Sequence, residues 1–299
     1  MRVAVTGGTG FIGSALVKGL LGRGDEVWIV TRSAESVKQR HARLQVITWK
    51  QLEESPDRLE GTEAIVNLAG ESIDQRWTDA AKERVFQSRL TAASRIATLV
   101  SALKSKPRIV VNASGVSYYG TSLTETFDER SPQRVVDFLS SVVAKWEEAA
   151  DRIPVERMVK LRAGLLIDNG GGAFPKMVLP YRLFSGGRIG SGKQWIPWIH
   201  LEDMIRLILF SLDNERISGP VNAVSPEPVT SDEFGRAIGR AMKRPHWFPV
   251  PAFLMKALFG EMAVLLLEGQ KALPTTALDA GFQFRFPDVD SAMRDLVGN

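Results

Sequence analysis

The glycine-rich segment at residues 2–13, RVAVTGGTGFIG, constrains the fold of this chain more than any other. A short apolar run leads into glycines at three-residue spacing, and an amphipathic stretch follows at residues 11–21. A strand, a tight turn and a helix start in this order let a pyrophosphate approach backbone N–H groups where the helix dipole favours negative charge. With a second apolar strand at residues 26–30, the pattern predicts a βαβ unit that binds a dinucleotide; a glycine turn without a ligand is the less favoured interpretation. The predicted contacts are Gly7, Thr9, Gly10, Phe11, Ile12 and Gly13.

Composition excludes several other classes of site. The 299 residues include no cysteine and three histidines (His41, His200 and His246), so we expect neither disulfides nor a metal centre. A net charge of +4 suits an anionic cofactor and gives no case for nucleic acid. No apolar run approaches the roughly 20 residues that span a bilayer, and the first strand begins at once, so we expect no membrane segment, no signal peptide and a cytoplasmic or organelle-matrix location.

Strand-like and helix-like segments alternate through the first half of the chain. Alternation of this kind is typical of a parallel sheet with helices on both faces. We therefore predict an α/β fold with a Rossmann-type doubly wound sheet of six or more strands, formed mainly by residues 1–165. The further predicted strands are 44–47, 64–68, 108–113 and 155–163, and the predicted helices are 78–103 and 137–150.

The second half has a different character, with glycine-rich loops at 170–172 and 185–192. We expect residues 166–299 to form a smaller substrate-binding lobe, with segments that return to the sheet. Helical patterns occur at 201–212, 231–242, 252–263 and 291–296. The most apolar stretch, 253–267, is expected to pack against the core, with a membrane-surface role as the weaker alternative.

The end of the second strand indicates which nucleotide is bound. A carboxylate at this point favours NAD, whereas an arginine accommodates the 2′-phosphate of NADP. The strand ends in Thr31 and Arg32 without an acidic residue, and together they offer phosphate a hydroxyl and a planar guanidinium, so NADP(H) is predicted. Arg32 could otherwise be a solvated surface residue. The segment Leu68-Ala69-Gly70, with its small residues alanine and glycine, would let the adenosine half lie against the backbone, unless it forms an ordinary turn.

Further distinctive segments are NLAGE (67–71), KWE (145–147), PWIH (197–200), LLEGQK (266–271) and AGFQF (280–284). With these and TGGTGFIG (6–13), the chain resembles the extended short-chain dehydrogenases/reductases, and in particular an epimerase-family branch of NADP-binding proteins. The resemblance covers essentially the whole chain. It implies that Thr31 and Arg32 hold the 2′-phosphate, that Leu68 and Ala69 line the adenosine side, and that Arg89 and Leu166 lie near the cofactor.

The expected catalytic groups are incomplete. Short-chain dehydrogenases use a tyrosine and a lysine four residues later on one helix face, with a nearby serine that polarises the carbonyl. Lys145 fits the lysine, although it could equally be a solvated helix residue. The position four before it is a serine, and the predicted helix contains no tyrosine. Ser114 or Ser117 could supply the serine, and Tyr118 or Tyr119 could supply the phenol; both tyrosines could equally line a pocket.

The sequence thus predicts an NADP(H)-dependent oxidoreductase or epimerase for a small carbonyl or sugar-like substrate. The alternative is an NADPH-binding regulator or scaffold that has lost catalysis, because the cofactor motifs are complete and the catalytic ones are not. A homodimer could form through the helix at residues 78–103, although its apolar face could equally cover the sheet.

Overall fold

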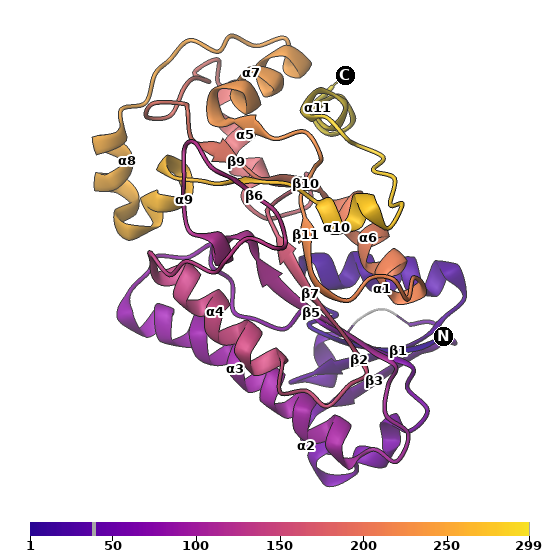
Figure 1. The fold of residues 1–299 in the computed structure, drawn as a ribbon. Coiled ribbons are helices and arrows are strands. Elements are labelled where there is room, and N and C mark those ends of the chain that lie inside the picture. The colour runs from indigo at the N-terminus through magenta and orange to yellow at the C-terminus, as the bar shows by residue number, and fades with distance from the viewer. Residues whose placement is uncertain (38–39, 299) are drawn as a thin grey trace.

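A parallel sheet forms the centre of the molecule (Figure 1). The structure is a computed structural model that describes residues 1–37 and 40–298. Seven strands of the described residues pair in the order β11-β7-β5-β4-β1-β2-β3, and all neighbours are parallel. This confirms the predicted doubly wound α/β class. The strands are β1 (Arg2–Thr6), β2 (Glu26–Thr31), β3 (Leu44–Thr48), β4 (Ala64–Asn67), β5 (Ile109–Gly115), β7 (Arg157–Ala163) and β11 (Gly219–Ala223).

Helices cover both faces of this sheet because its strands are apolar on both sides. Short 3₁₀ segments η1 (Ala34–Ser36), η2 (Pro56–Leu59) and η3 (Val116–Tyr119) lie in the connections. One face packs on α1 (Phe11–Arg23) and α6 (Leu201–Asp213), and the other packs on α2 (Trp49–Glu54), α3 (Asp79–Ala102) and α4 (Phe138–Ala150).

The strand order reverses between β1 and β4. From β1 the chain proceeds through β2 and β3 toward one edge, and from β4 it proceeds through β5 and β7 toward the other. Ligands of doubly wound folds bind beyond the carboxyl ends of the strands at such a switch point. The glycine turn after β1 and the NLAG segment after β4 therefore lie where a cofactor site is expected.

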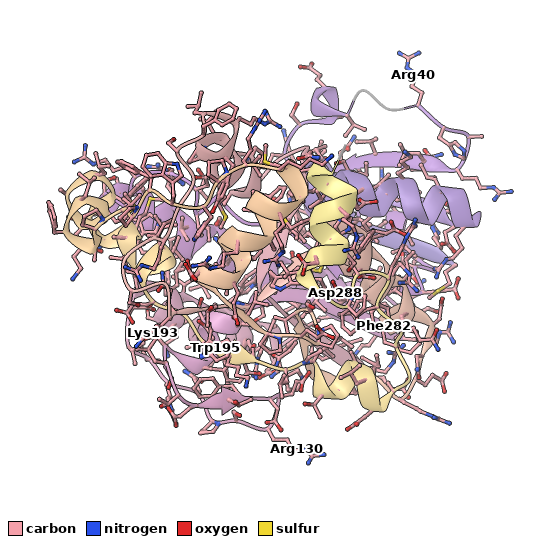
Figure 2. The ribbon with its side chains drawn as sticks, turned by 90° about the horizontal axis from the view of Figure 1, so that it is seen from above. Arg40, Arg130, Lys193, Trp195, Phe282 and Asp288 are labelled. Atoms are coloured by element: carbon pink, nitrogen blue, oxygen red, sulfur yellow. The ribbon has the colours of Figure 1, made fainter. Side chains whose placement is uncertain are left out.

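The remaining elements form a second lobe above the carboxyl ends of the strands, with α7 (Ser231–Met242) and α11 (Val289–Val297) side by side at its top (Figure 1). Asp288, labelled in Figure 2, caps the start of α11 by accepting a hydrogen bond from the Ser291 N–H at 2.7 Å. The helices of this lobe are α5 (Phe174–Arg182), α7 (Ser231–Met242), α8 (Ala252–Phe259), η4 (Gly260–Ala263), α9 (Val264–Leu267), α10 (Thr275–Asp279) and α11 (Val289–Val297).

In the described part of the chain, three short two-stranded pairs lie outside the central sheet; one links residues 126–127 to residues 271–272, and the other two lie within residues 165–230. The three pairs are β6 (Thr126–Phe127) with β13 (Lys271–Ala272), β8 (Leu165–Ile167) with β10 (Trp198–His200), and β9 (Trp195–Ile196) with β12 (Val229–Thr230). The central sheet itself takes β11 from the second half of the sequence. The division of the chain at residues 165 and 166 stays a prediction.

The prediction that residues 253–267 pack against the core is wrong. Phe253 is 73% exposed and Leu258 is 66% exposed, whereas Met255 on the same helix is buried. The predicted helix at 252–263 is also interrupted, since α8 ends at Phe259 and η4 follows. Among the described residues, no helix is long and apolar enough to cross a membrane.

Candidate functional site

The turn after β1 is packed so closely that two of its positions admit only glycine. A Cβ on Gly13 would lie 2.1 Å from the carbonyl oxygen of Gly7. Gly7 itself has φ +70°, and a Cβ there would lie 2.6 Å from the carbonyl oxygen of Leu68. The Gly10 N–H donates to the Gly7 carbonyl at 2.9 Å and closes the turn. The glycine turn and the NLAG segment are therefore in direct contact.

The first turn of α1 has the properties of an anion site. Gly10 is the N-cap residue and offers no side-chain acceptor to the free N–H groups of the helix. Thr9 and Gly10 are exposed, while Phe11 and Ile12 are half-buried. Uncapped N–H groups and the positive end of the helix dipole both favour a phosphate. The residues present therefore fit the diphosphate of a dinucleotide.

The polar residues at the end of β2 are placed one strand away from this turn. Thr31 is the last residue of β2, and its hydroxyl contacts the Ser33 carbonyl oxygen at 3.2 Å. Arg32 is exposed directly after the strand. A guanidinium at this position suits a 2′-phosphate, as the sequence predicts.

A buried polar ladder holds the NLAG segment. Thr6 donates its hydroxyl to Asn67 Oδ1 at 2.6 Å, and Asn67 Nδ2 donates to Asn112 Oδ1 at 2.6 Å. The same Asn67 oxygen accepts the Ala69 N–H at 3.3 Å. The ladder crosses β1, β4 and β5 at their carboxyl ends. Leu68, Ala69 and Gly70 are thereby fixed beside the glycine turn, half-buried or exposed.

Arg89 of α3 reaches the same place. Its Cζ lies 3.2 Å from the position of a Cβ on Gly70, and its guanidinium donates to the carbonyl oxygens of Glu71 at 3.1 Å and Val85 at 2.8 Å. The Arg89 Cζ lies over the ring of Trp146, 5.0 Å from the ring centroid. Burial lowers the pKa of Arg89 to about 10, opposed by Glu71, so the group keeps its charge at neutral pH.

Leu166 is the most distant of the predicted cofactor residues in sequence. It lies half-buried in β8, which continues from β7 after Gly164. Its carbonyl oxygen is 3.7 Å from the position of a Cβ on Gly172, and the ring of Phe11 is 3.6 Å from the same position. Leu166 and Phe11, which follows the glycine turn, therefore both lie next to Gly172.

The carboxyl end of β5 carries a closed network of buried polar groups. Ser114 donates its hydroxyl to Glu147 Oε1 at 2.7 Å, and Arg162 donates to both oxygens of Glu147 at 2.8 and 2.9 Å. Burial disfavours the charge of Arg162, but Glu147 outweighs it and raises the pKa of the guanidinium. Because the Ser114 proton is donated to Glu147, this hydroxyl is not directed at a substrate carbonyl.

The two neighbouring tyrosines differ in their surroundings. Tyr119 is fully buried; its hydroxyl donates to Asn222 at 2.7 Å and accepts from Arg162 at 2.8 Å. Burial raises the pKa of Tyr119 to about 12, although Arg162 opposes the shift. Tyr118 is half-buried, and its ring centroid lies 3.4 Å from Arg162 Cζ. Among the described residues, no hydrogen bond engages the Tyr118 hydroxyl. Of the two phenols, only that of Tyr118 is accessible.

Lys145 lies at the surface of α4, as expected for a solvated helix lysine. Its ammonium pairs with Glu148 at 2.9 Å, and the side chain is 57% exposed. Val143, two residues earlier and so on the opposite side of the helix, lies 3.3 Å from the position of a Cβ on Gly115 of β5. The face of α4 toward β5 therefore carries Val143 and Glu147, and Lys145 is on the outer face.

Sequence reasoning assigned no role to Glu147 and offered Arg162 only as a contact for an anionic substrate. The signal was an arginine between two apolar residues in a strand expected to be buried, which needs a buried partner. That partner is 15 residues away on another element.

Lys193 and Trp195 lie on the opposite side of the molecule from Arg40 (Figure 2). Among residues 1–37 and 40–298, no cluster of acidic or histidine side chains could hold a metal ion.

Comparisons with known proteins find two matching family models and several relatives that match the full length of the chain. The NAD dependent epimerase/dehydratase family matches residues 3–138, and a domain of unknown function, DUF1731, matches residues 250–296. Epimerase family protein YfhF of Bacillus subtilis is 39% identical over 302 residues, covering 100% of this chain and 99% of that protein. A relative from Arabidopsis thaliana, the chloroplastic SDR39U1 homolog, is 37% identical over 99% of this chain and 87% of its own.

The human relative, epimerase family protein SDR39U1, is 40% identical over 99% of this chain and 100% of its own. Its crystal structure, isoform 2 with NADPH, superposes with a TM-score of 0.90 and covers 99% of both chains. These full-length similarities carry the conclusion. The chain belongs to the epimerase family, as an SDR39U1-like member of the extended short-chain dehydrogenases/reductases.

Proposed function

We propose that this protein binds NADP(H) and acts as an oxidoreductase or epimerase on a small carbonyl or sugar-like substrate. The uncapped glycine turn fits a diphosphate, and Arg32 after β2 suits the 2′-phosphate. NADPH in the crystal structure of the human relative supports the same choice. The bound nicotinamide would supply or accept a hydride. The cytoplasmic location and the homodimer stay predictions.

One observation carries the catalytic part of the proposal: the accessible phenol of Tyr118 lies on a buried guanidinium. Arg162 Cζ is 3.4 Å from the ring centroid, and Glu147 holds the guanidinium in place through two hydrogen bonds. A fixed cation beside the ring stabilises negative charge that develops on the phenol oxygen during proton transfer. Tyr118 would then exchange the proton with substrate, and Arg162 would take the part that a lysine has in other short-chain dehydrogenases.

Nucleotide choice can be tested by titrating the protein with NADPH and NADH and following nicotinamide fluorescence. We expect NADPH to bind more tightly. Replacing Arg32 with alanine should weaken NADPH binding by about tenfold or more, because a charge-assisted hydrogen bond is lost, and should leave NADH binding unchanged. Equal loss for both nucleotides would show that Arg32 does not distinguish them.

Catalysis can be tested by adding a panel of aldehydes, ketones and sugars to the NADPH complex. With a substrate identified, Tyr118→Phe should lower kcat by about 10²–10⁴, the range of general acid catalysis, and leave the NADPH Kd unchanged. Tyr119→Phe is the comparison: its enclosed phenol cannot donate to substrate, but it accepts a hydrogen bond from Arg162, so we expect a smaller loss of kcat than in Tyr118→Phe. Full activity in Tyr118→Phe would exclude this residue as the proton donor.

A second candidate function is an NADPH-binding regulator without catalysis. In its favour, the expected catalytic groups already interact with other side chains. The Ser114 hydroxyl donates to Glu147, and Lys145 pairs with Glu148 on the outer face of α4. This function predicts tight NADPH binding and no consumption of the nucleotide with any member of the panel. Turnover that depends on Tyr118 would exclude it.

A further inference from the structure

Three successive glycines of the second lobe lie on the ring of Phe11. A Cβ on Gly171 would meet the ring at 3.1 Å, one on Gly172 at 3.6 Å and one on Gly170 at 3.8 Å. Phe11 is the first residue of α1 and follows the N-cap Gly10. A side chain at Gly171 would force the main chain or the ring to shift by a few tenths of an ångström, whereas a Cβ at Gly170 or Gly172 would meet the ring at ordinary contact distance. Gly171 therefore permits main chain of the second lobe to lie directly on Phe11, beside the glycine turn.

The same segment is fastened to the loop on the other side of the switch point. Lys176 in the first turn of α5 donates to both oxygens of Asp74 at 2.7 and 2.8 Å. Asp74 belongs to the connection between β4 and α3, which begins with the NLAG segment. Residues 168–176, here called the glycine strap, thus contact the β1–α1 turn at one end and the β4–α3 loop at the other.

The strap presents backbone donors. Asp168 Oδ1 accepts the Gly170 N–H at 2.6 Å, which folds the start of the strap. Gly172 has φ +71°, a conformation that favours glycine. Among the described residues, the N–H groups of Gly171 and Gly172 have no acceptor. Free N–H groups next to an uncapped helix N-terminus are suited to an anion with several oxygens.

We infer that the glycine strap is a part of the cofactor site, in which the N–H groups of Gly171 and Gly172 donate to the diphosphate of NADP(H). The diphosphate is then held from two sides, by the first turn of α1 and by the second lobe, and the Lys176–Asp74 pair keeps the strap closed. This inference rests on the proposed binding of NADP(H).

The test compares NADPH with adenosine 2′,5′-bisphosphate, which has the 2′-phosphate but no diphosphate bridge. Gly171→Val adds bulk against Phe11, and Gly22→Val is the matched control because a Cβ at Gly22 meets nothing within 4 Å. By calorimetry we expect Gly171→Val to raise the NADPH Kd about tenfold and to leave the bisphosphate Kd unchanged. Gly22→Val should change neither.

Two results would overturn the inference: an unchanged NADPH Kd in Gly171→Val, or an equal loss for both ligands, which would mean that the turn itself is distorted. A wild-type protein that binds no NADPH would instead contradict the proposed function.

Should Gly171→Val fail to fold, Lys176→Ala at the surface tests the same strap. Its NADPH dissociation rate in stopped flow should rise about threefold, the worth of an exposed ion pair, and the exchange Lys176→Asp with Asp74→Lys should restore it. A wild-type rate in Lys176→Ala would also overturn the inference.

Discussion

Glu147 and Glu148 are neighbours in α4 with opposite surroundings. Glu147 is buried and forms the ion pair with Arg162, whereas Glu148 pairs with Lys145 in solvent. Removing one partner of a buried pair leaves an uncompensated charge, so we expect Glu147→Gln to lower the free energy of unfolding by about 3 kcal/mol. Glu148→Gln should change it by less than about 0.5 kcal/mol. Urea unfolding of both variants measures the difference, and equal stability would contradict an enclosed pair.

His200 is a second residue whose charge depends on its surroundings. Its Nδ1 accepts the Glu202 N–H at 3.1 Å and caps α6, while its ring packs on that of Phe286 with the centroids 4.0 Å apart and the planes tilted by 37°. Burial lowers the pKa of His200, and the nearby carboxylates Asp295, Asp203, Glu202 and Asp168 oppose the shift without cancelling it. The histidine is therefore neutral in the folded protein at neutral pH.

The lowered pKa of His200 predicts a loss of stability in mild acid. Below about pH 6.5 the unfolded chain binds the proton and the folded chain does not, so stability falls as pH falls toward the folded pKa. His200→Asn, which can still cap α6, should be less stable at pH 7 but should lose less on going to pH 5.5. Urea unfolding at several pH values checks this, with His41→Asn as an exposed control; parallel profiles for His200→Asn and wild type would contradict it.

At the scale of elements, the carboxyl end of α6 is held by a single arginine of the neighbouring strand. Arg157 of β7 donates to the carbonyl oxygens of Ser211 at 2.7 Å, Leu212 at 3.1 Å, Asn214 at 3.2 Å and Ile217 at 3.0 Å. The last carbonyls of a helix lack partners within the helix, and a cation there also complements the helix dipole. Arg157 thus joins α6 to the sheet.

We expect Arg157→Met to lower the free energy of unfolding by about 1.5–3 kcal/mol, the worth of hydrogen bonds to a charged group. Hydrogen exchange should accelerate first in the last turn of α6, since its carbonyls lose their donor. Arg152→Met, an exposed change, should leave both measurements as in wild type. Unchanged exchange in α6 would show that the arginine is not needed there.

The elements that sequence reasoning predicted are those with local signals. The glycine turn, the apolar strands and α3, which begins after the N-cap Thr78, are all encoded within a few residues. The ion pair of Glu147 with Arg162 depends on how α4 crosses β5 and β7, and no local pattern contains that crossing. Lys145 was assigned by spacing, but which face of α4 meets the sheet is set by Val143 and its neighbours.

At the scale of the whole molecule, apolar sequence did not predict burial. Phe253 and Leu258 are exposed on α8, although the pattern around them resembles that of a core helix. A run of apolar residues shows only that exposing these side chains to water is unfavourable. Whether the fold covers it depends on the contacts of the complete chain.

These exposed side chains should contribute little to stability. Phe253→Ser and Leu258→Ser are expected to change the free energy of unfolding by less than about 0.5 kcal/mol. Phe234→Ala, in the buried core of the second lobe, should cost about 3–5 kcal/mol. Denaturant unfolding of the three variants measures these changes. A large loss of stability in Phe253→Ser would mean that α8 is covered in the folded protein.

The outermost strand of the central sheet, β11, has a consequence for chimeras within this family. Because β11 and α6 come from the second half of the sequence but pack on the first, a single crossover after residue 165 transfers part of the nucleotide-binding sheet together with the new lobe. A graft that keeps the sheet of one parent intact must instead exchange two separate inserts, residues 164–200 and 224–298. Recombination between relatives is therefore expected to succeed with two inserts where it fails with one.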